Sequence, residues 1–324
     1  MIVCVNEPMV KELINEREIL AINPDLATDA GSLASKIGLI KAIKDYNLSR
    51  VISFHSRVKS AKVFSSELHD IVGLVDAKSR PSGLIWTDYV SGQMKANDRA
   101  AKINKLKDLG SYDRGLLTNA RCLSEGVDVP ALDGIAFIDP KSSQVDIIQA
   151  VGRAIRLSAG KDKGTIILPV FIEDHDDPEV VLDESNFKPI WDVLKALRAH
   201  DENLADQLDE YRTAMGRVLT RTQRKASDKI IVDLPLDLNS QFSEALQTKL
   251  VEMTTSNWNT WYGLLLDYHA EHGDCLVNAS FKVCGYNLGS WISAQRTNKS
   301  TLSAKRLERL NALGFVWDAF EAAW

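Results

Sequence analysis

Hydrophobic and polar positions alternate along the first half of the chain with two different periods. Short apolar runs, typical of buried strands, occur at 51–54, 84–90, 114–118, 134–138 and 165–171. Between them, apolar residues recur at helical spacing, over 32–46, 60–68 and 98–109. Strands that alternate with helices predict a doubly wound parallel sheet, which binds its ligands at the carboxyl ends of the strands. We therefore expect an α/β fold for residues 1–172.

The rest of the chain follows mainly the helical period. Residues 173–254 predict an all-α connector with helices at 187–200, 203–218 and 239–254, although 229–234 alternates like a strand. Residues 255–324 hold five of the seven tryptophans and predict three short helices, at 258–270, 288–296 and 303–313. We expect a small tri-helical domain here, whose core is assigned to Leu265, Trp291, Leu307 and Trp317. In the first half, the helix at 98–109 should have Asn97 as its N-cap and stop at Gly110.

Composition narrows the function only slightly. The 324 residues are enough for two domains, and a net charge of −5 gives no global sign of a polyanionic partner. The four cysteines show neither C-x-x-C pairing nor a histidine at zinc-ligand spacing, which argues against a structural metal. The cysteine pattern fits a reduced, cytoplasmic interior best. No apolar run approaches the ~18 residues of a membrane span, so we also expect a soluble protein.

Candidate chemistry concentrates in two polar segments, each of which follows a predicted strand. The first holds Glu125, Gly126 and Asp128. The second is a helix in which Gln149, Gly152, Arg153 and Arg156 stand at i, i+3, i+4 and i+7, along one stripe. A solvated helix face is the simplest explanation of such a stripe. A glycine inside the helix and a nearby carboxylate that could accept sugar hydroxyls favour a nucleotide, with Asp128 on the ribose and the arginines on the phosphates.

The two segments resemble conserved motifs of superfamily two helicases of the DEAD/DEAH type. The stretch T-N-A-R-C-L-S-E-G-V-D-V-P-A-L-D looks like motif V, and Q-A-V-G-R-A-I-R looks like motif VI. The resemblance implies a RecA-like second helicase lobe in which Arg153, Arg156 and Gln149 act in catalysis. It further implies that Glu125, Gly126, Asp128 and Gly152 line the nucleotide.

A weaker resemblance concerns contacts with nucleic acid. Phe54-His55-Ser56-Arg57 follows the first core strand and resembles motif IV. In the family, residues of motif IV and the threonine of motif V face the nucleic-acid backbone, which implies that Ser56 and Thr118 touch phosphates. Hydroxyls at strand ends equally form local turn bonds. His55 is expected to be a satisfied loop histidine and not a catalytic base.

The chain lacks the other half of a helicase motor. Neither G-x-x-x-x-G-K-S/T, which cradles phosphates, nor an acidic D-E-x-D/H box occurs in it. ATP and Mg²⁺ would then be held mainly by a separate N-terminal lobe that carries the P-loop. We expect a fragment of a longer protein, or a chain that works with a partner lobe. A non-catalytic nucleic-acid-binding module and an unrelated doubly wound nucleotide binder are the alternatives.

The tail resembles the helicase-associated domain that follows such motors in bacterial proteins. Its W-x-x-x-Y-x-x-L-x-x-Y, L-G-x-W-I-x-x-Q-R and L-G-F-x-W patterns carry the resemblance. An excess of cations between 282 and 309 predicts binding to a nucleic-acid backbone, DNA before RNA, with a solvated face as the alternative. The predicted contacts are Lys282, Arg296, Lys299, Lys305, Arg306 and Arg309.

Overall fold

The structure is a computed structural model. It describes residues 1–6, 8–10, 30–120, 132–139, 147–148, 164–172, 178–183, 187–217, 226–235, 238 and 240–318. The chain divides into two compact units that interleave in sequence. One comprises residues 1–201 and 229–246, and the other comprises residues 202–228 and 247–324.

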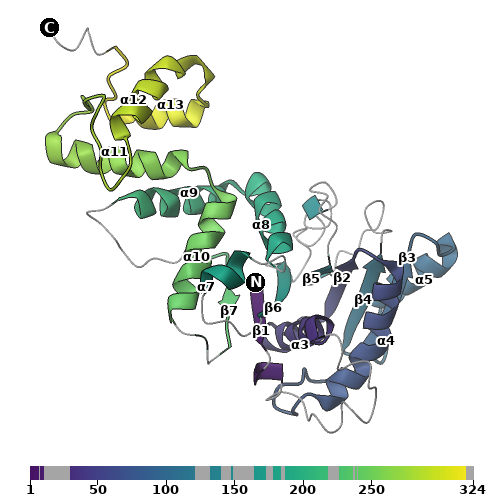
Figure 1. Cartoon of the computed structure of the whole chain (residues 1–324). Coiled ribbons are helices and arrows are strands. Elements are labelled where there is room, and N and C mark those ends of the chain that lie inside the picture. The colour runs from purple at the N-terminus through teal and green to yellow at the C-terminus, as the bar shows by residue number, and fades with distance from the viewer. Residues whose placement is uncertain are drawn as a thin grey trace. The chain divides into compact units, whose positions relative to one another are not determined.

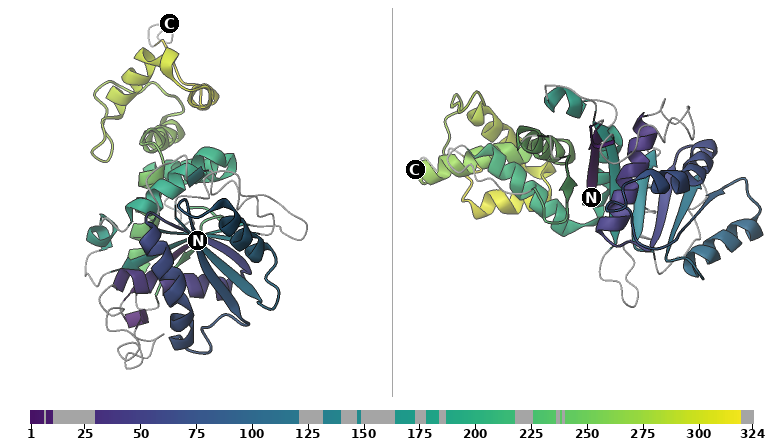
Figure 2. Two further views of the ribbon diagram at one scale, coloured as in Figure 1. Left: turned by 90° about the vertical axis from the view of Figure 1, so that its right-hand side faces the viewer. Right: turned by 90° about the horizontal axis from the view of Figure 1, so that it is seen from below.

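A parallel sheet forms the centre of the first unit (Figures 1 and 2). Over the described residues it has seven strands in the order β3-β4-β2-β5-β6-β1-β7, and every strand pair is parallel. The strands are β1 (Ile2–Asn6), β2 (Arg50–His55), β3 (Ile85–Ser91), β4 (Arg114–Ala120), β5 (Gly134–Asp139), β6 (Thr165–Ile172) and β7 (Val232–Asp233). The predicted α/β class is confirmed. The segment with strand-like alternation contributes β7, which pairs with β1.

Helices cover both faces of this sheet. α3 (Ala30–Asp45) and α4 (Val58–Leu74) pack side by side, while α5 (Ala96–Lys107) packs against β3 and β4. The connections from β1 through α3 to β2 and from β2 through α4 to β3 both run toward the β3 end of the sheet, whereas the connection from β3 through α5 to β4 runs back. Because such crossovers are right-handed, α5 lies on the face of the sheet opposite to α3 and α4. The sheet is therefore doubly wound.

Small residues allow the close approach of helices to the sheet. A Cβ on Gly38 of α3 would lie 3.1 Å from Pro169 of β6, and a Cβ on Gly115 of β4 would lie 2.8 Å from Leu106 of α5. Buried residues of α3 and α4 form one core with β1 and with the centre of the sheet. Burial of this apolar surface is what holds the layers together.

One predicted helix boundary is wrong. α5 begins at Ala96, and Lys95, not Asn97, occupies the N-cap position, with no side-chain capping bond. The helix ends at Lys107. Gly110 follows with φ +60°, so it serves the turn into β4 and does not cap the helix.

The remaining helices are shared between the two units. They are α7 (Pro178–Asp183), α8 (Lys188–His200), α9 (Glu202–Gly216), α10 (Ser240–Thr254), α11 (Trp258–His272), α12 (Leu288–Thr297) and α13 (Ala304–Ala312), with a short 3₁₀ turn at Lys299–Thr301. α7 and α8 belong to the first unit, and α9 and α11 to α13 belong to the second. The boundaries of these units differ from those of the predicted domains, 1–172, 173–254 and 255–324.

α9 packs directly on α11 within the second unit. A Cβ added to Gly216 would lie 2.2 Å from the carbonyl oxygen of Thr260, and one added to Gly263 would lie 2.1 Å from that of Thr213. The two helix backbones therefore touch where both helices lack side chains. Arg309 of α13 joins them, because it donates to Asn259 Oδ1 at 2.9 Å and to Thr213 Oγ1 at 3.0 Å.

The core of the second unit differs in part from the prediction. Leu265 is fully buried, and Trp291 and Trp317 pack against the core from its edge. Leu307 is only partly buried and lies outside this cluster, where Leu310 takes the expected place. The shift of three residues follows from the face that α13 turns toward Tyr262, whose hydroxyl donates to Arg309 O at 3.1 Å.

Candidate nucleotide and nucleic-acid site

Three adjacent strands bring the two polar segments to one edge of the sheet. β2 lies between β4 and β5, and Phe54 is paired with both Asn119 and Phe137. All three strands are parallel, so the segments that follow β4 and β5 leave from the same edge, one strand apart. This is where the sequence places the nucleotide.

The predicted nucleotide and catalytic residues lie outside the described residues. They are Glu125, Gly126, Asp128, Gln149, Gly152, Arg153 and Arg156. Their roles therefore stay predictions. What the structure adds is the common edge of the sheet from which both segments start.

His55, at the end of β2, is held as a neutral side chain. It is 6% exposed, its Nε2 lies 3.0 Å from Ser53 Oγ, and its ring packs 4.9 Å from the ring of Phe64. Burial lowers the pKa of His55 to about 4, against an attraction to Asp139 that raises it, while the charge of Lys36 lowers it further. A buried imidazole with this pKa is a packing element at neutral pH, as the sequence indicated.

Ser56 and Asp139 connect two strand ends across this edge. The partly exposed Ser56 hydroxyl donates to Asp139 Oδ2, which joins the loop after β2 to the end of β5. The sequence analysis missed Asp139, although the pair Asp139-Pro140 directly after an apolar run is a turn signal that could have drawn attention to it. Contact of Ser56 with a phosphate stays a prediction, at a position that solvent can reach.

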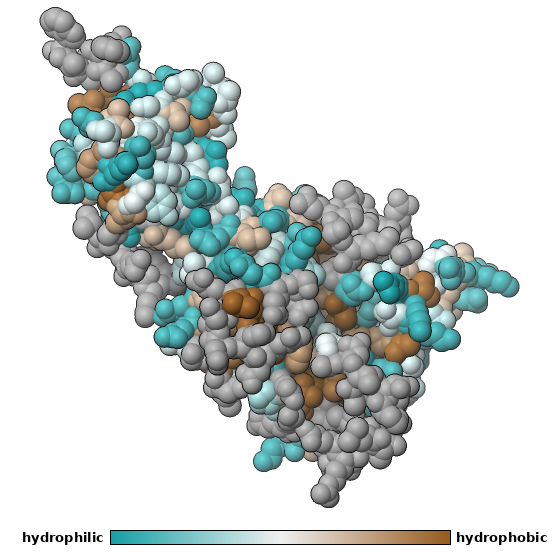
Figure 3. All heavy atoms as spheres, viewed as in Figure 1, coloured by the Kyte–Doolittle hydropathy of each residue, from teal (hydrophilic) through white to brown (hydrophobic). Residues whose placement is uncertain are grey.

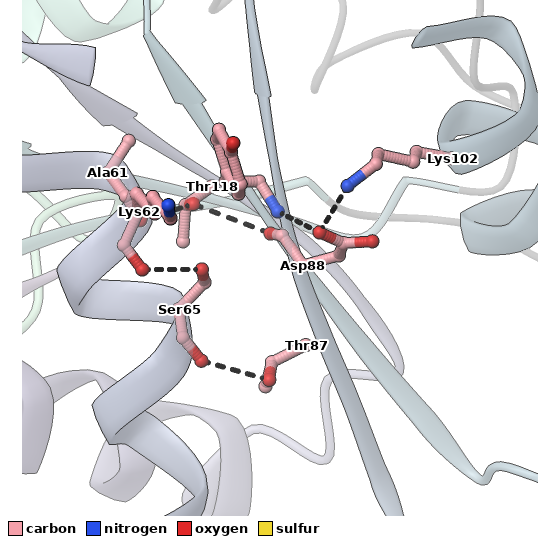
Figure 4. Close-up of polar contacts among 8 residues, drawn as sticks. Ala61, Lys62, Ser65, Thr87, Asp88, Lys102 and Thr118 are labelled. Carbon is pink, nitrogen blue, oxygen red and sulfur yellow. Dashed lines mark hydrogen bonds and ion pairs between the residues drawn. The ribbon is translucent and has the colours of Figure 1, made fainter. Parts of the chain in front are cut away.

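Thr118 lies in the interior, between α4 and the sheet (Figure 4). It is 0% exposed, and its Oγ1 donates to the carbonyl oxygen of Ala61 at 2.8 Å. Thr87 of β3 makes a similar bond to Ser65 O at 3.0 Å, so two hydroxyls fix α4 to the sheet. A contact of Thr118 with a phosphate stays a prediction, and it would require this internal bond to open.

Near Thr118, an ion pair joins β3 to α5. Lys102 Nζ lies 2.5 Å from Asp88 Oδ1 and 4.9 Å from the centre of the Tyr89 ring (Figure 4). The Tyr89 amide donates to the same carboxylate oxygen at 2.7 Å. Both charged side chains are partly exposed, so this pair adds little to stability and chiefly orients the end of β3.

Most of the predicted nucleic-acid contacts in the tail have partners within their own unit. Arg296 Nε donates to Val316 O at 2.8 Å, Arg306 donates to Ser256 Oγ at 2.8 Å, and Lys305 pairs with Asp206. Lys299 Nζ lies 4.7 Å from the centre of the Trp317 ring, and Arg309 donates hydrogen bonds to Thr213 of α9 and Asn259 of α11. Among the described residues of this set, Lys282 is the exposed cation for which no partner is found. Counting charges could not reveal these pairings, because their partners are distant in sequence.

Within the described parts of the chain, no group of three or more His, Cys, Asp or Glu side chains could hold a metal ion. None of the helices in those parts has both the length and the hydropathy needed to cross a bilayer.

Comparison with known families identifies two matched regions. Residues 36–158 match the helicase conserved C-terminal domain, and residues 255–318 match the helicase associated domain. The first region contains β2 to β5 and both polar segments. The second contains α11 to α13.

Individual relatives are distant and much longer than this chain. The UvrABC system protein B of Bacillus subtilis is 24% identical over 69% of this chain and 34% of its own length. A probable helicase of African swine fever virus is 33% identical over 49% of this chain and 16% of its own length.

One solved structure has a similar fold. The ATP-dependent Type ISP restriction-modification enzyme LlaBIII, bound to DNA, aligns with a TM-score of 0.61 and 20% identity over 100% of this chain and 24% of that one. The chain thus spans about a quarter to a third of the LlaBIII and UvrABC proteins that it matches. The two matched domains and the fold confirm the resemblance to superfamily two helicases, with a C-terminal RecA-like lobe followed by a helicase-associated domain.

Proposed function

We propose that the chain is the C-terminal part of an ATP-dependent DNA helicase or translocase, and that it supplies the arginine finger and part of the nucleic-acid track. The common edge formed by β4, β2 and β5 carries the proposal, since it starts both polar segments one strand apart. Asp128 and Gly126 would line the nucleotide from one segment. Arg153 and Arg156 would approach its γ-phosphate from the other.

The arginines are proposed to act on charge that develops during hydrolysis. ATP would lie between this lobe and a P-loop lobe that holds most of the Mg²⁺ contacts. Cations placed in advance at that interface stabilise the transition state more than the bound nucleotide. In related NTPases, an arginine supplied in this way raises the rate by ~10³ to 10⁵. Closure and reopening of the lobes would then move a strand that passes Ser56.

DNA is proposed over RNA because the LlaBIII structure, whose fold resembles that of this chain, has DNA bound. The tail cations of the prediction would add phosphate contacts through Lys282, with the others contributing only if they leave their internal partners.

ATP hydrolysis tests the motor function. We expect the 324-residue chain alone to show no turnover, with or without DNA, because half of the phosphate cage is absent from it. Joined to its P-loop lobe, it should hydrolyse ATP. Arg153→Ala or Arg156→Ala should then lower turnover by ~10³ or more while ATP binding persists.

A control separates this role from a general effect of charge. Lys44→Ala removes an exposed cation at the end of α3 and should leave turnover unchanged. Wild-type turnover in both arginine variants would refute the arginine-finger assignment. Absence of turnover in the two-lobe wild-type protein would instead favour a non-catalytic DNA-binding module.

A further inference from the structure

Trp261 and Trp291 of the second unit differ from Trp258 and Trp317 in the hydrogen bonding of their ring N–H groups. Trp258 Nε1 donates to Gln295 Oε1 at 2.9 Å, and Trp317 Nε1 donates to Asn311 Oδ1 at 2.8 Å. Trp261 and Trp291 make no such bond to the described residues, and neither nitrogen is among the buried polar atoms left without a partner there. Their ring N–H groups therefore reach solvent. A buried tryptophan ordinarily satisfies this donor inside the protein.

These two rings and Tyr286 form one aromatic surface. Trp261 and Trp291 are partly buried and lie almost parallel, with ring centres 6.2 Å apart and planes inclined by 7°. The Tyr286 ring stands edge-on to Trp261, at 5.1 Å, and Tyr286 is 41% exposed. We call Trp261, Trp291 and Tyr286 the aromatic surface.

A rigid turn presents Tyr286. Val283 and Tyr286 exchange backbone hydrogen bonds of 2.9 and 2.8 Å, which leaves Cys284 and Gly285 as a two-residue connection. Both have positive φ, +50° and +81°, as a type I′ turn requires. A positive φ at a cysteine is unfavourable, and such strain persists where the surrounding structure fixes it. The backbone that carries the tyrosine is therefore fixed before any ligand binds.

The charge beside the turn indicates what the surface binds. Lys282 directly precedes the turn, is exposed, and is without a partner in the described part of the chain. An exposed tyrosine beside two partly exposed tryptophans, next to an exposed cation, suits a base and the phosphate that follows it. On the face of the second unit that Figure 3 shows, at the upper left, hydrophilic and neutral residues predominate.

We propose that the aromatic surface stacks unpaired bases of single-stranded DNA, with Lys282 on the adjacent phosphate. This site rests on the proposed function and deepens it, because through it the helicase-associated domain would bind the bases of the separated strand. Stacking tolerates any sequence, since every base offers a flat face. The site therefore suits an enzyme that moves along DNA.

Binding to DNA with and without bases tests the proposal. Fluorescence anisotropy of the full chain would be measured with a labelled oligothymidylate of about 20 nucleotides, and with an abasic oligonucleotide of the same length and charge. We expect about tenfold tighter binding to the strand with bases, a preference that corresponds to ~1.4 kcal/mol. Tyr286→Ala should remove most of this preference and leave affinity for the abasic strand unchanged, whereas Tyr286→Phe should keep it.

Two further variants complete the experiment. Tyr46→Ala removes a tyrosine of similar exposure, 37%, from the first unit and should bind both strands like the wild type. Lys282→Ala should weaken binding to both strands and reduce its salt dependence. Circular dichroism would confirm that each variant is folded, and the exposed position of Tyr286 makes the loss of its ring tolerable to the fold.

The outcomes separate this proposal from the proposed function. Equal affinity for the two strands, or a preference that survives Tyr286→Ala, would overturn base stacking while DNA binding through phosphates stands. Failure of the wild type to bind either strand at low salt would overturn the site altogether. Hydrolysis by the two-lobe protein would still decide the motor function independently.

Discussion

The neutral state of His55 makes the first unit sensitive to acid. The His55 pKa falls from an ordinary value of 6.5 to about 4, chiefly because the ring is buried against Phe64. The folded protein therefore binds this proton less readily than the unfolded chain. The resulting stability is complete above pH 6.5 and is lost as the pH falls toward 4. At most, the shift corresponds to ~3 kcal/mol.

The substitution His55→Gln isolates this contribution. The linkage relation gives a loss of ~2 kcal/mol from this one group between pH 7 and pH 5, because the unfolded histidine is then mostly protonated and the folded one is mostly not. Glutamine carries no charge at either pH. The variant should therefore lose ~2 kcal/mol less than the wild type over this interval, whatever its stability at pH 7.

Hydrogen exchange of β2 and β4 peptides measures this difference, since it reports opening of the first unit separately from the second. His69→Gln, which changes an exposed histidine of α4, is the matched control and should behave like the wild type. If the wild type and His55→Gln lose the same free energy of opening between pH 7 and pH 5, the argument from burial is wrong.

Other predictions concern packing. Thr118→Val should cost ~0.5–1.5 kcal/mol in the opening free energy of β4, measured in the same way, because it removes the hydrogen bond from the Thr118 hydroxyl to the carbonyl oxygen of Ala61; an unchanged value would contradict the tether. Gly216→Ala should lower the thermal stability of the second unit by ~1–3 kcal/mol, since its Cβ would lie 2.2 Å from Thr260 O. Gly73→Ala is its control: it meets nothing within 4 Å in α4 and should stabilise by ~0.5–1 kcal/mol. Equal melting shifts of the two variants would refute the close contact.

The sequence predicted the sheet well because burial leaves a local signature. The apolar runs at β2 to β6 are found where they were expected, since strands covered on both faces must be apolar throughout. Most helices also agree within a few residues. Asn97 misled because an N-cap side chain contributes only ~1 kcal/mol and does not decide by itself where a helix begins; α5 begins one residue before Asn97.

Hydrogen-bond partners that are distant in the chain could not be predicted from the sequence. Nothing near Thr118 indicates that its hydroxyl meets Ala61, or that Arg309 meets Thr213, 96 residues away. The assignment of α9 to the C-terminal unit had one available signal, a glycine on each of α9 and α11, which weakens a helix unless a neighbour comes close. The aromatic surface escaped notice because tryptophans at helical spacing look alike whether or not their ring N–H is satisfied.

The contact between Gly216 and Gly263 has a consequence for the order in which the protein is made. α9 leaves the ribosome well before α11, and the strand β7, which completes the sheet of the other unit, is synthesised between them. In the nascent chain, the surface of α9 around Gly216 therefore has no helix to pack against until about forty further residues have left the ribosome. Truncations that stop before α11, and clones that begin at residue 255, should each yield an orphaned half of this helix pair and be prone to aggregation.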